Sequence, residues 1–196
     1  MQNGVFIFFA ALVLSISTWL DKLYDVLEIR KDYAIMFLIS SLLLNFLIFD
    51  ASTEIQINPA TVFIIFVLAI CAYINKQFPV VLFVVLSITA ALLSVLFIKV
   101  CPMFNILFPV TIFTGIFGIV FYKTPYFSAV ISCVFPAISY FISMLFEYTV
   151  LVKYETITTT TVFSAQAIGL CMALLFSYIR AALAKRKTVV SENTVK

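Results

Sequence analysis

The feature of this sequence that most restricts its fold is a series of seven long apolar stretches, separated by charges, prolines and polar clusters. A helix that spans a bilayer needs about 20 mostly apolar residues, with a range of about 17–25. The stretches that approach or meet this length are 4–20, 33–49, 59–75, 78–98, 104–122, 126–146 and 161–182. The sequence therefore predicts an all-α integral membrane protein, a polytopic bundle of about seven transmembrane helices.

The composition also indicates that lipid surrounds most of the chain. Of its 196 residues, 64% are apolar and only 11% are charged, and the mean hydropathy is +1.20. Soluble domains are roughly 45–50% apolar and about 25% charged, so a soluble fold of this length could not bury so many apolar side chains. We expect a single transmembrane helical domain over residues 1–184 and a short basic cytoplasmic tail over 185–196.

The basic residues predict the orientation, because Lys and Arg beside short loops are retained on the cytoplasmic side. Seven alternating spans place ten basic residues on one side and only Lys99 and Lys153 on the other. The ten are Lys22, Arg30, Lys31, Lys76, Lys123, Arg180, Lys185, Arg186, Lys187 and Lys196. The C-terminus is thus expected in the cytoplasm and the N-terminus outside. Residues 1–4 carry no basic charge, so no cleaved signal peptide is expected. The abundant Phe, Ile and Lys fit a bacterial plasma membrane.

The residue types that carry most enzyme and metal chemistry are absent or scattered. The chain has no histidine, and its four cysteines lie singly in apolar stretches, which is typical of small apolar fillers rather than of a metal or redox site. No charged residue lies near the middle of a predicted span, which argues against an ion-coupled pump. We therefore predict no catalytic residue, no cofactor, no metal site and no nucleic-acid partner. The outer carboxylates are expected to be solvated rather than to form a cation site or an acid and base pair; they are Asp50, Glu54, Glu147 and Glu155.

Polar and small residues gather on one face of several predicted helices. In 126–146 this face combines Pro136 with four serines, which are Ser128, Ser132, Ser139 and Ser143, all within roughly 100° at the helical period. In 161–182, Ala165, Gly169 and Ala173 repeat every four residues, with Gln166 beside them. These faces either pack helices closely or line a cavity for a small, weakly polar molecule or a lipid.

Three further features leave alternatives open. Pro109 and Pro136 lie within predicted spans, where proline tends to kink a helix. Thr114, Gly115 and Gly118 favour close packing of the span 104–122. The segment 21–32 has apolar residues at helical spacing. It is expected to continue the first helix along the inner membrane surface, as an amphipathic connector or as a docking face for a partner.

The leading functional hypothesis is a non-catalytic multi-pass membrane protein that acts as a subunit, scaffold or regulator of a membrane complex. Its expected partners are the lipid bilayer together with another membrane protein or a second copy of the chain. The alternative is a small-molecule transporter, or a membrane-embedded substrate-binding subunit of one, in which Gln166 and the serines would supply hydrogen bonds to the substrate.

Overall fold

The computed structural model describes residues 3–47, 49–50, 56–77, 79–101, 105–150 and 159–194. Within these ranges the chain is helical apart from turns and two strands of two residues each. The elements in order are α1 (Asn3–Ile16), α2 (Asp21–Leu27), α3 (Lys31–Leu44), β1 (Phe49–Asp50), β2 (Gln56–Ile57), α4 (Pro59–Ile74), α5 (Val80–Val100), α6 (Leu107–Val120), α7 (Pro125–Val150) and α8 (Thr159–Thr194). The predicted all-helical class is confirmed.

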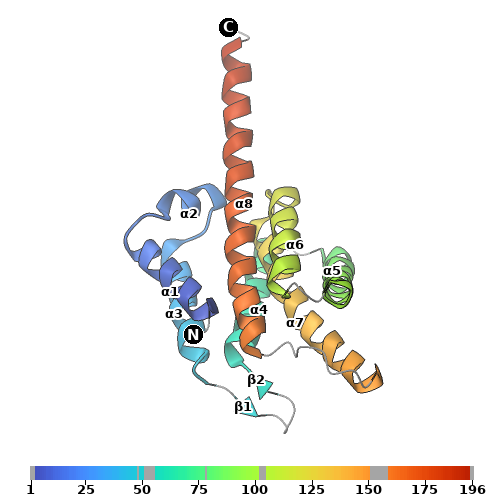
Figure 1. Ribbon diagram of the computed structural model, residues 1–196. Coiled ribbons are helices and arrows are strands. Elements are labelled where there is room, and N and C mark those ends of the chain that lie inside the picture. The colour runs from blue at the N-terminus through green and yellow to red at the C-terminus, as the bar shows by residue number, and fades with distance from the viewer. Residues whose placement is uncertain are drawn as a thin grey trace.

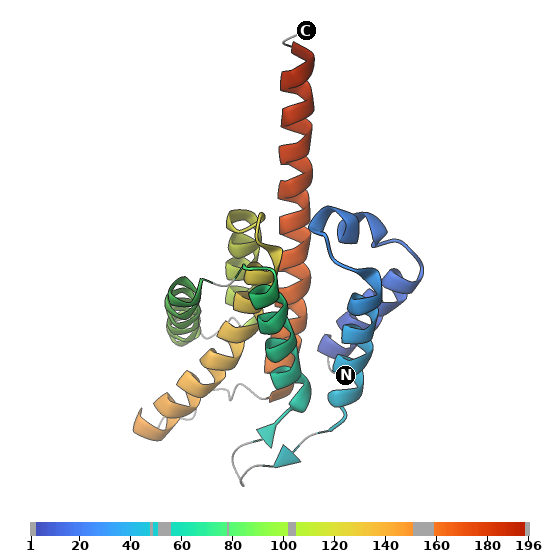
Figure 2. The same cartoon turned by 180° about the vertical axis from the view of Figure 1, so that it is seen from behind.

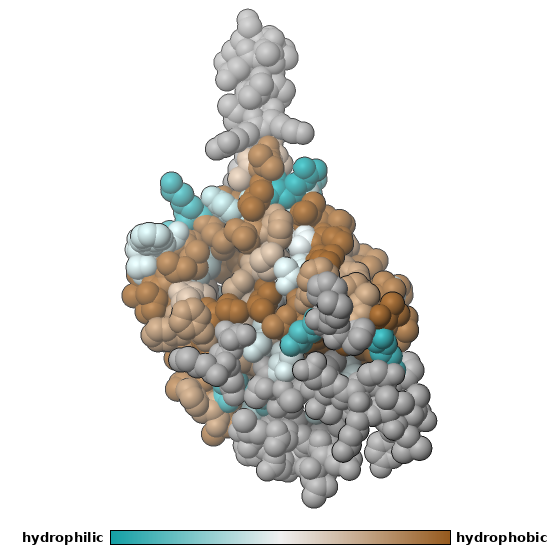
Figure 3. All heavy atoms as spheres, viewed as in Figure 1, coloured by the Kyte–Doolittle hydropathy of each residue, from teal (hydrophilic) through white to brown (hydrophobic). Residues whose placement is uncertain are grey.

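Each of the seven predicted spans coincides with one of these helices, but only some are long enough to cross a bilayer by themselves. In the described part of the chain, three helices pass by length and apolar composition, namely Val80–Val100, Pro125–Ser143 and Thr161–Ala184. A fourth span results if α1 and α2 are counted together. The structure thus supports membrane association, and Figure 3 shows apolar residues over most of the described part of one face.

Helix α8 is the central column of the bundle and extends beyond it at the C-terminal end (Figure 1). It packs against α6 and α7 most extensively and also against α1, α2 and α4. Helices α1 and α3 form a pair on one side, whereas α5 lies outside, against α7. Figures 1 and 2 look nearly along the axis of α5, so this helix is steeply inclined to α8.

The core is built from the faces that these helices turn toward α8. Phe8 of α1 and Phe163 of α8 are fully buried, and their rings meet edge to face at 5.3 Å between centroids. A second cluster forms where Phe135 of α7 meets Phe113 and Phe117 of α6, again edge to face. Aromatic pairs of this kind add to the energy of close packing.

The expectation that 21–32 continues the first helix needs correction. Helix α1 ends at Ile16, and α2 turns away from it by 92° after a break that contains Thr18 at φ 68°. Tyr24 and Leu27 of α2 are buried, and α2 packs on α8. Tyr24 and Leu27 are therefore covered by the chain itself, whereas Leu20 and Leu23 of the same face are half-buried.

The expectation of a kink at Pro109 also needs correction, because Pro109 does not lie in the middle of a helix. Helix α6 begins at Leu107, so Pro109 lies in its first turn, where backbone N–H groups have no intrahelical partner and proline costs little. Pro136, in contrast, lies inside α7.

Candidate functional site

The serine face of α7 is turned into the bundle. Ser128, Ser132 and Ser139 are fully buried, while Ser143 is half-buried. The Ser139 hydroxyl donates to the carbonyl oxygen of Phe135, four residues earlier, at 2.8 Å, and lies 3.5 Å from the carbonyl oxygen of Ala91 on α5. This serine therefore sits where α7 meets α5.

Gln166 of α8 is fully buried between α7 and α4. Its amide Nε2 donates to the carbonyl oxygen of Cys133 at 2.9 Å and lies 3.5 Å from that of Thr61. Two carbonyl oxygens on the same side fix the orientation of the amide, because only its nitrogen can donate to them. Gln166 thus joins three helices through backbone atoms.

Several buried oxygens have no hydrogen-bond partner within the described part of the chain. They belong to Thr61, Ser87, Ser128, Ser132 and the Oε1 atom of Gln166. A buried polar group without a partner costs about 1–3 kcal/mol. Oxygens of this kind can form hydrogen bonds to water or to a ligand. They are therefore the observation that favours a cavity, rather than close packing, at these helix faces.

The small residues form contacts that leave little room for a ligand between α8 and its neighbours. A β-carbon at Gly169 would lie 2.8 Å from the carbonyl oxygen of Ser132, and one at Gly118 would lie 2.7 Å from that of Ala173. Real Cβ atoms do not approach so closely. The small-residue faces predicted on α6 and α8 therefore bring backbones into direct contact.

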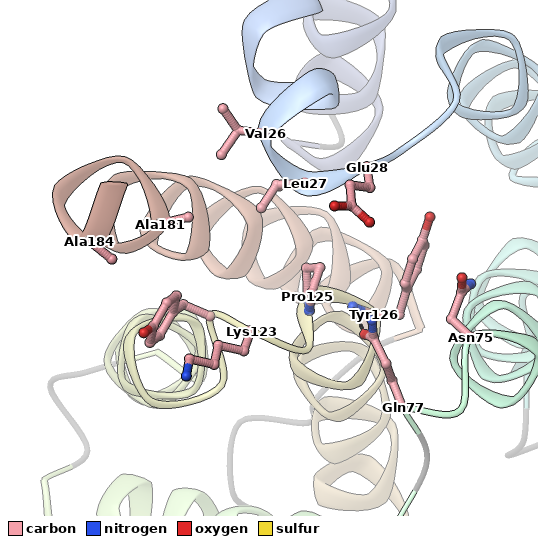
Figure 4. A pocket seen from close by; sticks show the side chains of 11 residues that line it. Val26, Leu27, Glu28, Asn75, Gln77, Lys123, Pro125, Tyr126, Ala181 and Ala184 are labelled. Atoms are coloured by element: carbon pink, nitrogen blue, oxygen red, sulfur yellow. Dashed lines mark hydrogen bonds between the residues drawn. The ribbon is translucent and has the colours of Figure 1, made fainter. Parts of the chain in front are cut away.

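A cavity of about 520 Å³ opens at the end of the bundle from which α8 projects. Four chain segments line it: the end of α2, the turn after α4, the connection from α6 to the start of α7, and α8. Their residues, in the same order, are Val26, Leu27 and Glu28; Asn75 and Gln77; Tyr122, Lys123, Pro125 and Tyr126; and Ala181 and Ala184. Figure 4 shows these side chains converging from their separate elements. The size is typical of small-molecule sites, at roughly 300–1,000 Å³.

Opposite charges lie on different walls of this cavity. Figure 4 shows the Glu28 carboxylate on the same side as Tyr126, and Lys123 on the other side with its ammonium nitrogen directed away from Glu28. The Lys123 ammonium is 5.9 Å from the centre of the Tyr122 ring, and the Arg180 guanidinium is 5.7 Å from it. Two cations therefore lie near one aromatic ring, and of these only Lys123 is among the residues that line the cavity.

Two unusual backbone conformations occur close to the cavity, at Glu28, which lines it, and at Lys76, which does not. Glu28 ends α2 at φ 56°, and Lys76 lies at φ 54° between two lining residues, Asn75 and Gln77. Left-handed geometry costs a residue with a side chain about 1–2 kcal/mol, so glycine usually occupies such positions. The Gln77 side chain also accepts a hydrogen bond from the backbone N–H of Tyr126 at 3.3 Å, which ties the strained turn to the start of α7.

The sequence predicted the polar faces but not this cavity, because its residues come from four segments far apart in the chain. The only indication of the cavity in the sequence is that Lys76, Lys123 and Arg180 are all expected on one side of the membrane.

Of the outer carboxylates, Glu54 and Glu155 lie outside the described residues, as do the side chains of Asp50 and Glu147. Among the described side chains, no group of His, Cys, Asp or Glu is arranged to hold a metal. No protein-family model, curated protein or solved structure matches this chain.

Proposed function

We propose that the chain crosses a bacterial plasma membrane seven times, with its N-terminus outside and its C-terminus in the cytoplasm. Support comes from the cavity end of the bundle, where the ends of α2, α4 and α6 lie together with Ala181 and Ala184 of α8. The basic residues beside these ends all come from the set expected in the cytoplasm. Helix α5 has the 21 residues that a span needs, but its steep inclination to α8 exceeds the tilt of about 0–40° usual for spanning helices, so the seven-span proposal requires α5 to reorient in the bilayer.

Within this topology, the chain acts without catalysis, as a subunit, scaffold or regulator of a membrane complex. The observation that carries this proposal is the packing of the interior. Gly169 lies directly against the backbone of Ser132, and Gln166 and Ser139 use their donors on helix carbonyls. A protein whose polar faces are occupied by neighbouring helices has its remaining binding capacity at its outer surface and at the end cavity.

Transport of a small molecule is the second candidate, and the unpartnered oxygens favour it. Ser128 and Ser132 lie one turn apart on the same helix, both fully buried, and neither hydroxyl has a partner among the described residues. In a transporter these hydroxyls would face substrate or water along a path through the bundle.

Native mass spectrometry of the protein purified from its own membranes tests the first candidate against the second. A protein partner at fixed stoichiometry, retained in gentle detergent and lost only with unfolding, is expected. A chain that is free of protein partners but retains a small metabolite would contradict the association proposal and favour transport. Chemical cross-linking in intact membranes before extraction provides the control for partners that detergent removes.

A further inference from the structure

We propose that the end cavity binds the headgroup of a phospholipid that carries a primary ammonium group as well as its phosphate. In this site Glu28 holds the ammonium and Lys123 holds the phosphate. The proposed orientation of the chain decides only which leaflet supplies the lipid, and that would be the cytoplasmic leaflet. It does not depend on a protein partner.

The distribution of charge favours a ligand that is itself zwitterionic. Within the described side chains, the ion pair that forms is between Lys31 and Asp21, at 2.8 Å, and neither Glu28 nor Lys123 takes part in one. Glu28 and Lys123 instead lie on separate walls of one cavity (Figure 4). A ligand with one positive and one negative group can satisfy both charges at once, whereas a purely anionic ligand would leave the carboxylate facing like charge.

The aromatic residues suit the same ligand. Tyr126 lies on the same side of the cavity as the Glu28 carboxylate, and an aromatic ring together with a carboxylate attracts an ammonium group by charge and by cation–π interaction. On the opposite side, Arg180 and Lys123 both lie close to Tyr122. Lys123 is the one of the two that lines the cavity, and its ammonium group can pair with a phosphate diester.

The remaining walls fit the part of a lipid that follows its headgroup. Val26, Leu27, Pro125, Ala181 and Ala184 are apolar or small, and they suit the glycerol and the first methylene groups. Helices α1, α3 and α4 expose apolar side chains elsewhere on the bundle, so a lipid in the cavity can keep its acyl chains in the surrounding bilayer. A soluble phosphate ester would leave the apolar part of the cavity unfilled.

The strained backbone at Glu28 places its side chain at the cavity. Glycine at φ 56° would relieve the strain, and a glycine at a helix C-terminus is the ordinary solution. The same conformation occurs at Thr18 and Lys76, neither of which lines the cavity, so the backbone places the Glu28 side chain but does not by itself assign it a function. Lys76, whose φ is nearly that of Glu28, serves as the matched comparison.

The test uses the full chain in lipid nanodiscs or mild detergent and native mass spectrometry. Phosphatidylethanolamine, phosphatidylcholine and phosphatidylglycerol with identical acyl chains are titrated in parallel. We expect phosphatidylethanolamine to bind about tenfold more tightly than the other two, because the choline group cannot donate hydrogen bonds and the glycerol group carries no charge. Equal binding of the three lipids would overturn the proposal.

Charge variants assign the two roles. Glu28→Gln should remove the preference for phosphatidylethanolamine over phosphatidylglycerol, and Lys123→Gln should weaken binding of both lipids. Asp25→Asn and Lys22→Gln remove the same charges from positions on α2 that are exposed, as Glu28 and Lys123 are, but lie outside the cavity, and they should change nothing. If these controls act like the cavity variants, the effect is general surface charge and the site is wrong.

Two glycine variants separate a loss of lipid binding from a loss of stability. Glu28→Gly and Lys76→Gly should both raise the Tm, because each relieves a left-handed residue, but only Glu28→Gly should abolish the lipid preference. A stable Glu28→Gly protein that still selects phosphatidylethanolamine would contradict the proposal. Soluble glycerophosphoethanolamine should not compete with the lipid, and full competition would reassign the site to a free phosphate ester. All these measurements use the purified chain, so they stand even if no protein partner is found.

Discussion

Gly169 of α8 lies against the backbone carbonyl of Ser132 of α7, so closely that a β-carbon at position 169 would be 2.8 Å from that oxygen. The same β-carbon would lie 3.1 Å from a methyl group of Thr114 on α6. One glycine therefore sets the distance between α8 and two other helices. Backbone atoms cannot move aside as a flexible side chain can, so the contact excludes any larger residue.

The first prediction follows from this contact. Gly169→Ala should destabilise the protein by about 1–3 kcal/mol, the usual cost of overpacking, and lower its Tm in detergent. Gly115→Ala is the matched control, because a β-carbon there meets the ring of Phe176 at 3.2 Å, and a side chain can shift. Gly169→Leu should be more damaging still, whereas Leu170→Ile should cost less than about 1.5 kcal/mol. Equal Tm values for the two alanine variants would show that α8 does not pack at Gly169.

The second prediction concerns the connection between α3 and α4. Asn58 donates from Nδ2 to Oδ1 of Asn45 at 2.7 Å and accepts from the backbone N–H of Ala60 at 3.0 Å, so one side chain caps α4 and also holds the end of α3. Asn58→Asp keeps a capping oxygen but loses the donor, whereas Asn58→Ala loses both. We expect Asn58→Ala to lower the Tm more, since capping alone contributes about 0.5–2 kcal/mol. The opposite order would mean that placing a buried carboxylate opposite Oδ1 of Asn45 costs more than losing the cap.

These contacts show which parts of the structure a sequence can predict. The helices follow the apolar stretches because a chain in lipid must satisfy its backbone hydrogen bonds within each segment. The close approach at Gly169 was predictable because only residues with little or no side chain allow backbones to touch. The break at Thr18 could not be predicted, since no glycine or proline marks the left-handed turn. The end cavity could not be predicted either, because it depends on how α2 folds back onto α8.

The third prediction tests the proposed orientation. In a background without native cysteines, Ser52→Cys and Thr158→Cys should react with an impermeant maleimide in intact cells. Ser191→Cys, in the C-terminal part of α8, should react only after the membrane is opened. Ser52 and Thr158 lie outside the described residues, so this assignment depends on the charge bias alone. Labelling of Ser191→Cys in intact cells would reverse the orientation.

The fourth prediction uses the buried amide of Gln166. Gln166→Met replaces it with an apolar side chain and removes both the bond to Cys133 and the unpartnered Oε1 atom. We expect a change within about 1 kcal/mol, because interhelical hydrogen bonds in membranes average about 0.6 kcal/mol. A strong loss of stability would show that the bond to Cys133 contributes more than a typical interhelical bond.

Gln166→Glu tests the same position with a group that can ionise. A carboxylate buried among helices costs far more than a buried amide or thioether unless it is paired. The Tm of Gln166→Glu should therefore be lower than that of Gln166→Met at neutral pH. Equal Tm values would mean that water reaches this position, as the transport candidate requires.

The last prediction separates a packed serine face from a cavity at Ser139. Its hydroxyl donates to the carbonyl of Phe135 in its own helix and the residue is fully buried where α7 meets α5. Ser139→Ala removes only that local bond and should leave the Tm nearly unchanged. Ser139→Leu must enter space already occupied by the backbone of α5 and should destabilise the protein by about 1–3 kcal/mol. A Ser139→Leu protein that is stable and well expressed, but no longer retains a small molecule found with the natural chain, would mean that the leucine fills a ligand site. That result would replace the association proposal with transport.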